Sequence, residues 1–196
     1  MQKQRVAIFA SGTGSNAVNL IHYFKNHSEI EVVFVMSNKE DAKVLQSAKN
    51  LDVATFFLPN QQVANAEPLL DLCKEHQVDW IILAGYLRLI PSKLITFYQD
   101  KMINLHPALL PNYGGKGMYG SNVHKAVIAN NENESGITIH FVNQEFDKGR
   151  IIAQFRCEIK EGDGVIELEQ KIRYLEQSYL PIVVEKTILR EEKRKL

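Results

Sequence analysis

Short apolar runs alternate with helical stretches through the first half of the chain, and this alternation is the strongest constraint on its fold. The strand-like runs cover residues 6–10, 31–36, 54–58, 80–83 and 102–105. The helical patterns between them cover residues 17–25, 42–50, 66–76 and 92–98. Strands that alternate with helices in this way form parallel α/β sheets. We therefore predict a Rossmann-like α/β fold, with a mainly parallel sheet flanked by helices.

The second half of the chain departs from this pattern. A helix is expected at residues 123–130, strands at 136–142 and 150–159, and a last helix from residue 165. Because two strands now follow one another, we expect a mixed edge on the sheet. Pro181 should start or kink the last helical run, since proline has no N–H to donate. No Pro- or Ser-rich linker and no internal repeat is present, so residues 1–196 are expected to form a single domain.

A glycine-rich loop joins the first strand to the first helix. Its sequence is Ser11-Gly12-Thr13-Gly14-Ser15-Asn16. Backbone N–H groups at a helix start bind anions, and glycine lets the backbone approach a phosphate closely. A dinucleotide fingerprint, with Ala17 in its third position, would need an acidic residue after the second strand, where the chain has Ser37-Asn38-Lys39. We predict a phosphorylated substrate, and a tight turn that packs the helix against the strand is the structural alternative.

Three polar residues suggest the chemistry. Ile103-Asn104-Leu105-His106 has the pattern of a strand end, whose period of two places Asn104 and His106 on one face. An amide NH2 can donate to an oxyanion, and an imidazolium can also deliver a proton to a departing amine. Asp147 is the candidate carboxylate that would keep His106 protonated, although an Asp two residues before a Gly is also a common turn former. Together the three residues predict acyl transfer between small molecules, without a metal or a covalent nucleophile.

Four motifs occur together along the chain. They are residues 11–16 (SGTGSN), 83–88 (LAGYLR), 104–111 (NLHPALLP) and 147–152 (DKGRII). In order and spacing they resemble the phosphoribosylglycinamide formyltransferase family, and the resemblance runs from about Val6 to about Pro181. It implies a formyltransferase fold. It also implies transfer of the formyl group of 10-formyltetrahydrofolate, as cosubstrate, to the amine of glycinamide ribonucleotide in purine synthesis.

The resemblance also implies a role for each of several residues. Asn104, His106 and Asp147 would be the catalytic group. The ribonucleotide would be bound by Gly12, Thr13, Gly14, Ser15, Asn16, Arg173 and Glu176. The folate would be bound by Leu87, Arg88, Leu89, Ile90, Asn143, Gln144, Glu145 and Phe146. Two features depart from the pattern or stay open: residues 60–62 (NQQ) stand where relatives can carry a basic residue near the folate tail, and the glycine-rich stretch 112–120 is either a lid or a mobile connection.

Composition narrows the range of partners. Lys and Arg number 23, as do Asp and Glu, and the resulting net charge of zero gives no general attraction to nucleic acid. No apolar run reaches membrane length, and the N-terminus lacks the features of a signal peptide. We therefore expect a cytoplasmic enzyme, a monomer or homodimer, with small-molecule substrates and no nucleic-acid or membrane partner. Cys73 and Cys157 fit no metal-ligand spacing, so no metal is expected and both should be reduced packing residues.

Two alternative functions use the same residues. A hydrolase would release formate from 10-formyltetrahydrofolate, with water in place of the amine. A non-catalytic folate or nucleotide binding module would keep the scaffold alone, and the presence of Asn104, His106 and Asp147 argues against it. His140, on a strand near the predicted site, is interpreted as a hydrogen-bonded strand residue, and neither it nor His124 has a metal partner at ligand spacing.

Overall fold

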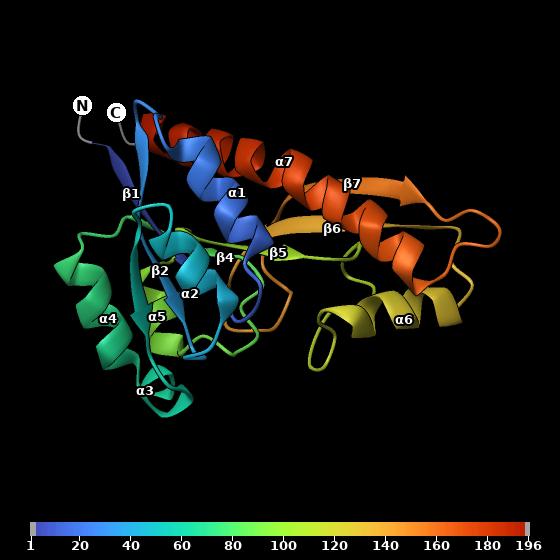
Figure 1. The fold of residues 1–196 in the computed structure, drawn as a ribbon, viewed down its shortest axis with the longest axis horizontal. Coiled ribbons are helices and arrows are strands. Elements are labelled where there is room, and N and C mark those ends of the chain that lie inside the picture. The colour runs from blue at the N-terminus through green and yellow to red at the C-terminus, as the bar shows by residue number, and fades with distance from the viewer. Residues whose placement is uncertain (1–2, 195–196) are drawn as a thin grey trace.

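The predicted alternation folds into a sheet with helices on both faces (Figure 1). The computed structural model describes residues 3–194. The strands are β1 (Gln4–Phe9), β2 (Ile30–Ser37), β3 (Ala54–Phe57), β4 (Trp80–Leu83), β5 (Met102–His106), β6 (Glu134–Phe141) and β7 (Ile151–Glu158). The helices are α1 (Ser15–Phe24), α2 (Lys43–Lys49), α3 (Asn60–Ala64), α4 (Ala66–Glu75), α5 (Ser92–Phe97), α6 (Ser121–Ala129) and α7 (Val165–Lys193).

Within residues 3–194, seven strands form one sheet in the order β3-β2-β1-β4-β5-β6-β7. The pairs from β3 through to β5 are parallel. Strand β6 pairs antiparallel with both β5 and β7. The prediction of a mainly parallel sheet with a mixed edge in the second half of the chain is confirmed.

The two faces of the sheet pack against different helices. On β1, the side chains of Val6 and Ile8 join a core with residues of α1, α2, α6 and α7. Those of Ala7 and Phe9 join a second core with residues of α3, α4 and α5. Successive strand residues point to opposite faces, so a strand covered on both sides must be apolar throughout, as β1 is from Val6 onward.

The sheet contains a point where the strand order reverses. Strands β2 and β3 lie on one side of β1, and β4 lies on the other. In open α/β sheets, ligands bind at such a point, beyond the carboxyl ends of the strands. Ser11 joins the loops there: its N–H donates to the Gly85 carbonyl (3.0 Å), and its hydroxyl donates to Asn38 Oδ1 (2.6 Å) and accepts from the Leu87 N–H (3.0 Å). Asn38 therefore supports the loops, at the strand end where a dinucleotide fold would carry an acidic residue.

Helix α7 passes through Pro181 without ending. A proline inside a helix leaves the carbonyl four residues earlier without its helical donor. That carbonyl belongs to Gln177, and the side-chain amide of Asn19 on α1 donates to it (2.7 Å). The alternative that a helix starts at Pro181 is therefore wrong, because α7 begins at Val165 and continues past this residue. Within residues 3–194, no helix, α7 included, combines the length and the apolar character needed to span a membrane.

Polar contacts join α1 and the residues just after it to the middle of α7. Figure 1 shows the two helices lying together on one side of the molecule. The side-chain contacts between them run from Asn16 with Glu176, through Asn19 with Gln177, to Tyr23 and His27 with Glu185. The start of α1, which carries the glycine-rich loop, is thus held in register with α7.

Candidate active site

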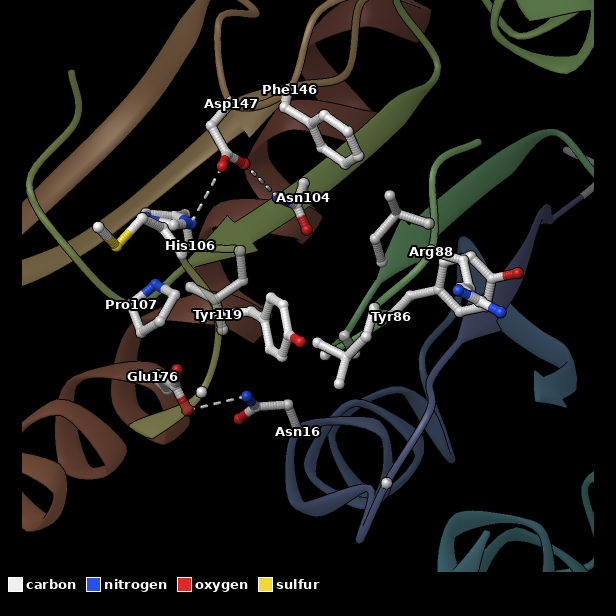
Figure 2. A pocket seen from close by; sticks show the side chains of 18 of the residues that line it. Asn16, Tyr86, Arg88, Asn104, His106, Pro107, Tyr119, Phe146, Asp147 and Glu176 are labelled. Atoms are coloured by element: carbon white, nitrogen blue, oxygen red, sulfur yellow. Dashed lines mark hydrogen bonds and ion pairs between the residues drawn. The ribbon is translucent and has the colours of Figure 1, made fainter. Parts of the chain in front are cut away.

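A cavity of about 830 Å³ opens at the carboxyl ends of β1, β4 and β5 (Figure 2). This volume is in the range of small-molecule binding pockets. All but one of the site residues predicted from the sequence line it: Gly12, Thr13, Gly14, Ser15, Asn16, Leu87, Arg88, Leu89, Ile90, Asn104, His106, Asn143, Glu145, Phe146, Asp147, Arg173 and Glu176. The exception is Gln144, whose side-chain amide donates to the Ser92 carbonyl of α5 (3.3 Å). The structure therefore does not bring Gln144 to the cavity.

His106 lies at the end of β5, and its side chain is almost fully buried. Its Nε2 lies 2.8 Å from the carbonyl oxygen of Tyr113. A carbonyl oxygen only accepts, so Nε2 carries the hydrogen. The other nitrogen, Nδ1, lies 3.6 Å from Oδ2 of Asp147. In the neutral ring Nδ1 therefore has a free lone pair on the side that faces the carboxylate.

Burial controls the charge of His106. Desolvation lowers the pKa of this imidazole below its ordinary value of 6.5, and nearby His140 lowers it further. Asp147 and the Tyr113 carbonyl both raise the pKa, but together they do not offset burial. Asp147 thus favours the protonated form of His106, as the sequence suggested, but burial has the larger effect and the net pKa lies below 6.5. Near pH 7 the ring is mainly neutral.

Asp147 occupies a turn and reaches the site as well. Its backbone adopts a positive φ of 55°, which Asp tolerates better than most residues. Two residues later, a Cβ on Gly149 would lie 1.6 Å from the Phe141 carbonyl oxygen, so the chain needs glycine there. Asp147 can therefore be both a turn former and a residue of the site, because the tight turn directs its carboxylate toward β5.

The carboxylate of Asp147 lies beside two histidine rings and a backbone N–H. Oδ2 accepts from the backbone N–H of Gly115 (2.9 Å), and Oδ1 lies 3.7 Å from His140 Nε2. Burial would raise the pKa of Asp147, but His140, His106 and the Gly115 N–H together bring it below its ordinary value. Asp147 is consequently a carboxylate near pH 7.

His140 and Asn104 are partners across the sheet. Their Cα atoms are paired in the β5–β6 register. Nδ1 of His140 lies 2.8 Å from the Phe141 carbonyl and must carry the hydrogen, so its Nε2 accepts from Nδ2 of Asn104 (3.1 Å). The second N–H of Asn104 faces Oδ1 of Asp147 at 3.5 Å, a long and weak contact. That N–H is the donor most readily offered to a ligand.

The glycine-rich loop has features of both structures that the sequence allowed, a tight packing turn and an anion-binding loop. Gly14 has a φ of 78°, and a Cβ there would lie 2.2 Å from Val44 Cγ2 on α2, so this glycine is required for packing. Gly12 has nothing within 4 Å of its Cβ position and lines the cavity. The first turn of α1 has no side-chain cap, so its N–H groups face the cavity end without an internal acceptor. This end of the cavity suits an anion.

Substituting the two glycines should separate packing from binding. Gly14→Ala is expected to lower the free energy of unfolding by about 1–3 kcal/mol, because the methyl group meets Val44 and the positive φ is strained. Gly12→Ala is expected to leave stability unchanged and to weaken phosphate binding. Urea unfolding and titration with ribose 5-phosphate check the pair. Equal stabilities of the two variants would contradict the assignment.

The side of the cavity near α7 carries hydrogen-bonding groups. Asn16 donates from Nδ2 to Oε2 of Glu176 (2.9 Å), and Arg173 lies exposed one turn earlier on α7. Burial raises the pKa of Glu176, opposed by the Asn16 hydrogen bond and by Arg173. Carboxylate and guanidinium groups beside an anion site can recognise sugar hydroxyls.

The opposite end of the cavity is apolar. The side chains of Leu87, Leu89 and Phe146 line it although they are 42%, 56% and 45% exposed. Arg88 lies among them, and its Nε donates to Oδ1 of Asn60 (2.7 Å). Exposed apolar side chains around a cavity favour a flat, partly apolar ligand such as an aromatic ring system. The two ends thus suit chemically different ligands.

Several lining residues were not predicted from the sequence. His140 is a hydrogen-bonded strand residue, as expected, and it also contacts both Asn104 and Asp147. Tyr119 projects into the cavity (Figure 2), and Lys116 and His124 also line it. Lys116 and Tyr119 lie in an irregular loop, where no periodicity tells which side chains point inward. A histidine between Ile and Phe on a strand was the one signal for His140, and it does not distinguish the two roles.

The two cysteines differ in burial. Both cysteines are free; Cys73 is buried in one core, as expected, whereas Cys157 is only partly buried against the other. Burial raises the pKa of the Cys73 thiol to about 12 and also raises that of Cys157, which disfavours the thiolate. In the described part of the chain, residues 3–194, no group of three or more His, Cys, Asp or Glu side chains could hold a metal ion.

Buried histidines should make the fold acid-sensitive. Burial lowers the pKa of His106 and of His124 below 6.5, although Glu169 opposes the shift at His124. As the pH falls below about 6.5, these two histidines therefore bind protons in the unfolded chain but not yet in the folded chain. Their contribution to the free energy of unfolding is fully present above that pH and is lost as the pH falls toward the folded pKa values. Urea unfolding at pH 8 and pH 5.5 measures the decline. His124→Gln should flatten it, exposed His22→Gln should not, and a decline unchanged by His124→Gln would contradict the prediction.

Known proteins resemble the chain over most of its length. A family model described as formyl transferase matches residues 4–184. A chloroplastic phosphoribosylglycinamide formyltransferase of Arabidopsis thaliana is 37% identical over 193 residues, which is 93% of this chain and 65% of the relative. The phosphoribosylglycinamide formyltransferase of Bacillus subtilis is 33% identical over 190 residues, which is 94% of this chain and 95% of the relative. A crystal structure of phosphoribosylglycinamide formyltransferase from Bacillus halodurans has a TM-score of 0.85 at 34% identity, covering 93% of this chain and 94% of that one.

These similarities agree with the fold and with the four motifs. The chain spans 65% of the length of the Arabidopsis relative, and almost the whole of the Bacillus subtilis relative. The structural likeness extends over the mainly parallel sheet and its antiparallel edge. The chain therefore belongs to the formyl transferase family.

Proposed function

We propose that this protein transfers the formyl group of 10-formyltetrahydrofolate to the amine of glycinamide ribonucleotide. The observation that carries the proposal is the meeting of Asn104, His106 and Asp147 between an anion-binding end and an apolar end of one cavity. A donor amide, a buried imidazole and a carboxylate are the groups that acyl transfer to an amine needs. Membership of the formyl transferase family, and relatives named phosphoribosylglycinamide formyltransferase, support the choice of substrates.

The two substrates are assigned to the two ends of the cavity. The phosphate of the ribonucleotide lies over the loop from Gly12 to Asn16, at the start of α1, where N–H groups are free to donate. Glu176 and Arg173 take the ribose hydroxyls. The pterin of the folate lies against residues 87–90 and residues 143, 145 and 146, at the apolar end. The amine and the formyl group then meet between the two ends, beside Asn104.

Formyl transfer proceeds through a tetrahedral intermediate. The lone pair of the amine forms a bond to the formyl carbon, and the carbonyl electron pair moves onto the oxygen. Asn104 donates to this oxygen the N–H that otherwise faces Asp147. Nδ1 of His106 takes the proton from the attacking nitrogen and later delivers it to the folate nitrogen. The bond from carbon to that nitrogen breaks, the carbonyl reforms, and tetrahydrofolate leaves.

The lowered pKa of His106 fits this order of events. The ring enters the cycle neutral, with its Nδ1 lone pair on the side of the carboxylate, and it is an imidazolium only while the intermediate exists. Asp147 stabilises that transient cation and remains ionised, much as a carboxylate supports a histidine base in other acyl-transfer sites. Holding both substrates in one cavity contributes further, up to about 7 kcal/mol where alignment is close to ideal.

The proposal is tested by following 10-formyltetrahydrofolate with and without glycinamide ribonucleotide. Production of tetrahydrofolate and of the formylated ribonucleotide only when the ribonucleotide is present would establish the transferase. Formate release without the ribonucleotide would make the protein a hydrolase. Tight folate binding with no turnover under either condition would show a binding module and overturn the proposal.

A further inference from the structure

The loop backbone at residues 113–115 contacts both His106 and Asp147. The Tyr113 carbonyl accepts from Nε2 of His106 (2.8 Å), and two residues later the Gly115 N–H donates to Oδ2 of Asp147 (2.9 Å). This short segment therefore contacts Nε2 of the imidazole through one backbone group and contacts, through another, the carboxylate that faces Nδ1. The relative placement of these two side chains depends on where the segment lies.

Tyr113 holds an uncommon backbone conformation in this segment. Its φ is 56°, in the left-handed region that aromatic residues rarely adopt. A residue in this conformation persists only where its surroundings fix it. Two kinds of contact do so here. The ring packs against the larger hydrophobic core, and the hydroxyl donates to Oε1 of Glu132 (2.6 Å) and accepts from Nδ2 of Asn130 (2.9 Å).

Both partners of the hydroxyl are exposed residues of the α6–β6 connection, outside the cavity. Asn130 follows the last residue of α6, and Glu132 lies two residues before the start of β6. The two hydrogen bonds of the hydroxyl therefore link Tyr113 to the connection between α6 and β6. Neither partner lines the cavity.

We propose that Tyr113 is a positioning residue: its hydroxyl, anchored to Asn130 and Glu132, holds its carbonyl against His106 and thereby fixes which imidazole nitrogen faces the reacting atoms. With the hydrogen kept on Nε2, the lone pair stays on Nδ1, beside Asp147. Without the carbonyl, the hydrogen can move to Nδ1, where the carboxylate attracts it, and the ring then loses its base on the cavity side. The proposal rests on the proton-carrying role assigned to His106 above.

The electrostatics around His106 provide a readout that does not depend on turnover. The pKa of His106 is raised by Asp147 and lowered by His140 of β6, and His106 in turn lowers the pKa of His124 on α6. The Tyr113 carbonyl raises the pKa of His106, so loosening this contact should lower it further. The same loosening should increase the share of the tautomer that carries its hydrogen on Nδ1. Both quantities are visible in nitrogen NMR spectra of protein labelled in histidine, with the His106 signals assigned by their loss in His106→Gln.

Tyr113→Phe tests the proposal, because it keeps the packed ring and removes only the hydroxyl. We expect kcat for formyl transfer to fall about three- to tenfold, KM for both substrates to stay within about twofold of the wild type, and the His106 pKa to fall. Glu132→Ala should behave like Tyr113→Phe. Glu132→Gln, which keeps an acceptor oxygen, should restore most of the rate. Tyr174→Phe, at a tyrosine 71% exposed on α7, is the matched control and should change nothing.

The possible results lead to different conclusions. Wild-type kcat and an unchanged His106 titration in both Tyr113→Phe and Glu132→Ala would overturn the proposal. A lower kcat with unchanged His106 pKa and tautomer would also overturn it, since the hydroxyl would then act only through general stability. If the wild-type protein did not formylate glycinamide ribonucleotide, the proposed function would fail, while the NMR comparison would still decide whether Tyr113 positions His106.

Discussion

Replacing His106 by asparagine is expected to lower kcat for formyl transfer by about 10²- to 10⁴-fold. The substitution removes the group that we propose carries the proton between the attacking amine and the departing folate nitrogen, and proton transfer by a placed side chain contributes about that much. Binding of both substrates should change little, because the phosphate end and the apolar end of the cavity are built by other residues. Initial rates of tetrahydrofolate formation measure kcat, and fluorescence titration measures folate affinity.

His22→Asn, an exposed position on α1, is the matched control for this variant. It should retain the wild-type rate. If His106→Asn kept more than about a tenth of kcat, proton transfer through this ring would be excluded as a major contribution. Loss of folate binding together with turnover would instead assign His106 to binding.

Replacing Asp147 by asparagine is expected to lower kcat by about 10²- to 10³-fold, or about 3–4 kcal/mol in activation free energy. Asn keeps an oxygen for the Gly115 N–H but carries no charge to stabilise the His106 imidazolium. Because the carboxylate raises the pKa of His106, its loss lowers that pKa further. The rise of kcat with pH that follows deprotonation of His106 should therefore shift to lower pH, toward a lower plateau. Rates measured from pH 5 to pH 9 check both effects.

Asp71→Asn, an exposed position on α4, controls for the change in net charge. A profile of Asp147→Asn with the wild-type inflection would show that Asp147 does not act on His106. If the variant lost activity because it unfolded, the main role of Asp147 would be to stabilise the fold through its backbone turn or its contact with Gly115.

The fold was largely predictable because its signals are local. Apolar runs and helical patterns recur in the spacing of a parallel α/β sheet, and the change of pattern after β5 marked the antiparallel edge. Helix α3 was missed because its five residues, NQQVA, have neither an apolar period nor a side-chain cap. The passage of α7 through Pro181 was missed because the compensating donor, Asn19, is 158 residues from the Gln177 carbonyl.

The sequence identified many of the residues that line the cavity, but not His140, Lys116 or Tyr119, and not the charge state of His106. A period of two on β5 was enough to place Asn104 and His106 at one cavity. The part played by His140 depends on the β5–β6 register, which two separate segments of sequence do not specify. The neutral state of His106 depends on burial, which outweighs the single carboxylate that the sequence pointed to.

The contacts between α1 and α7 bear on the entropy of binding. A ligand at the anion end of the cavity meets N–H groups of α1 and the carboxylate of Glu176, and the hydrogen bonds from Asn16 to Glu176 and from Asn19 to Gln177 already fix these groups relative to one another. Little conformational freedom is then lost when the ligand arrives, so more of the interaction energy appears as affinity. This half of the cavity is preorganised by helix pairing, at a distance from the reacting atoms.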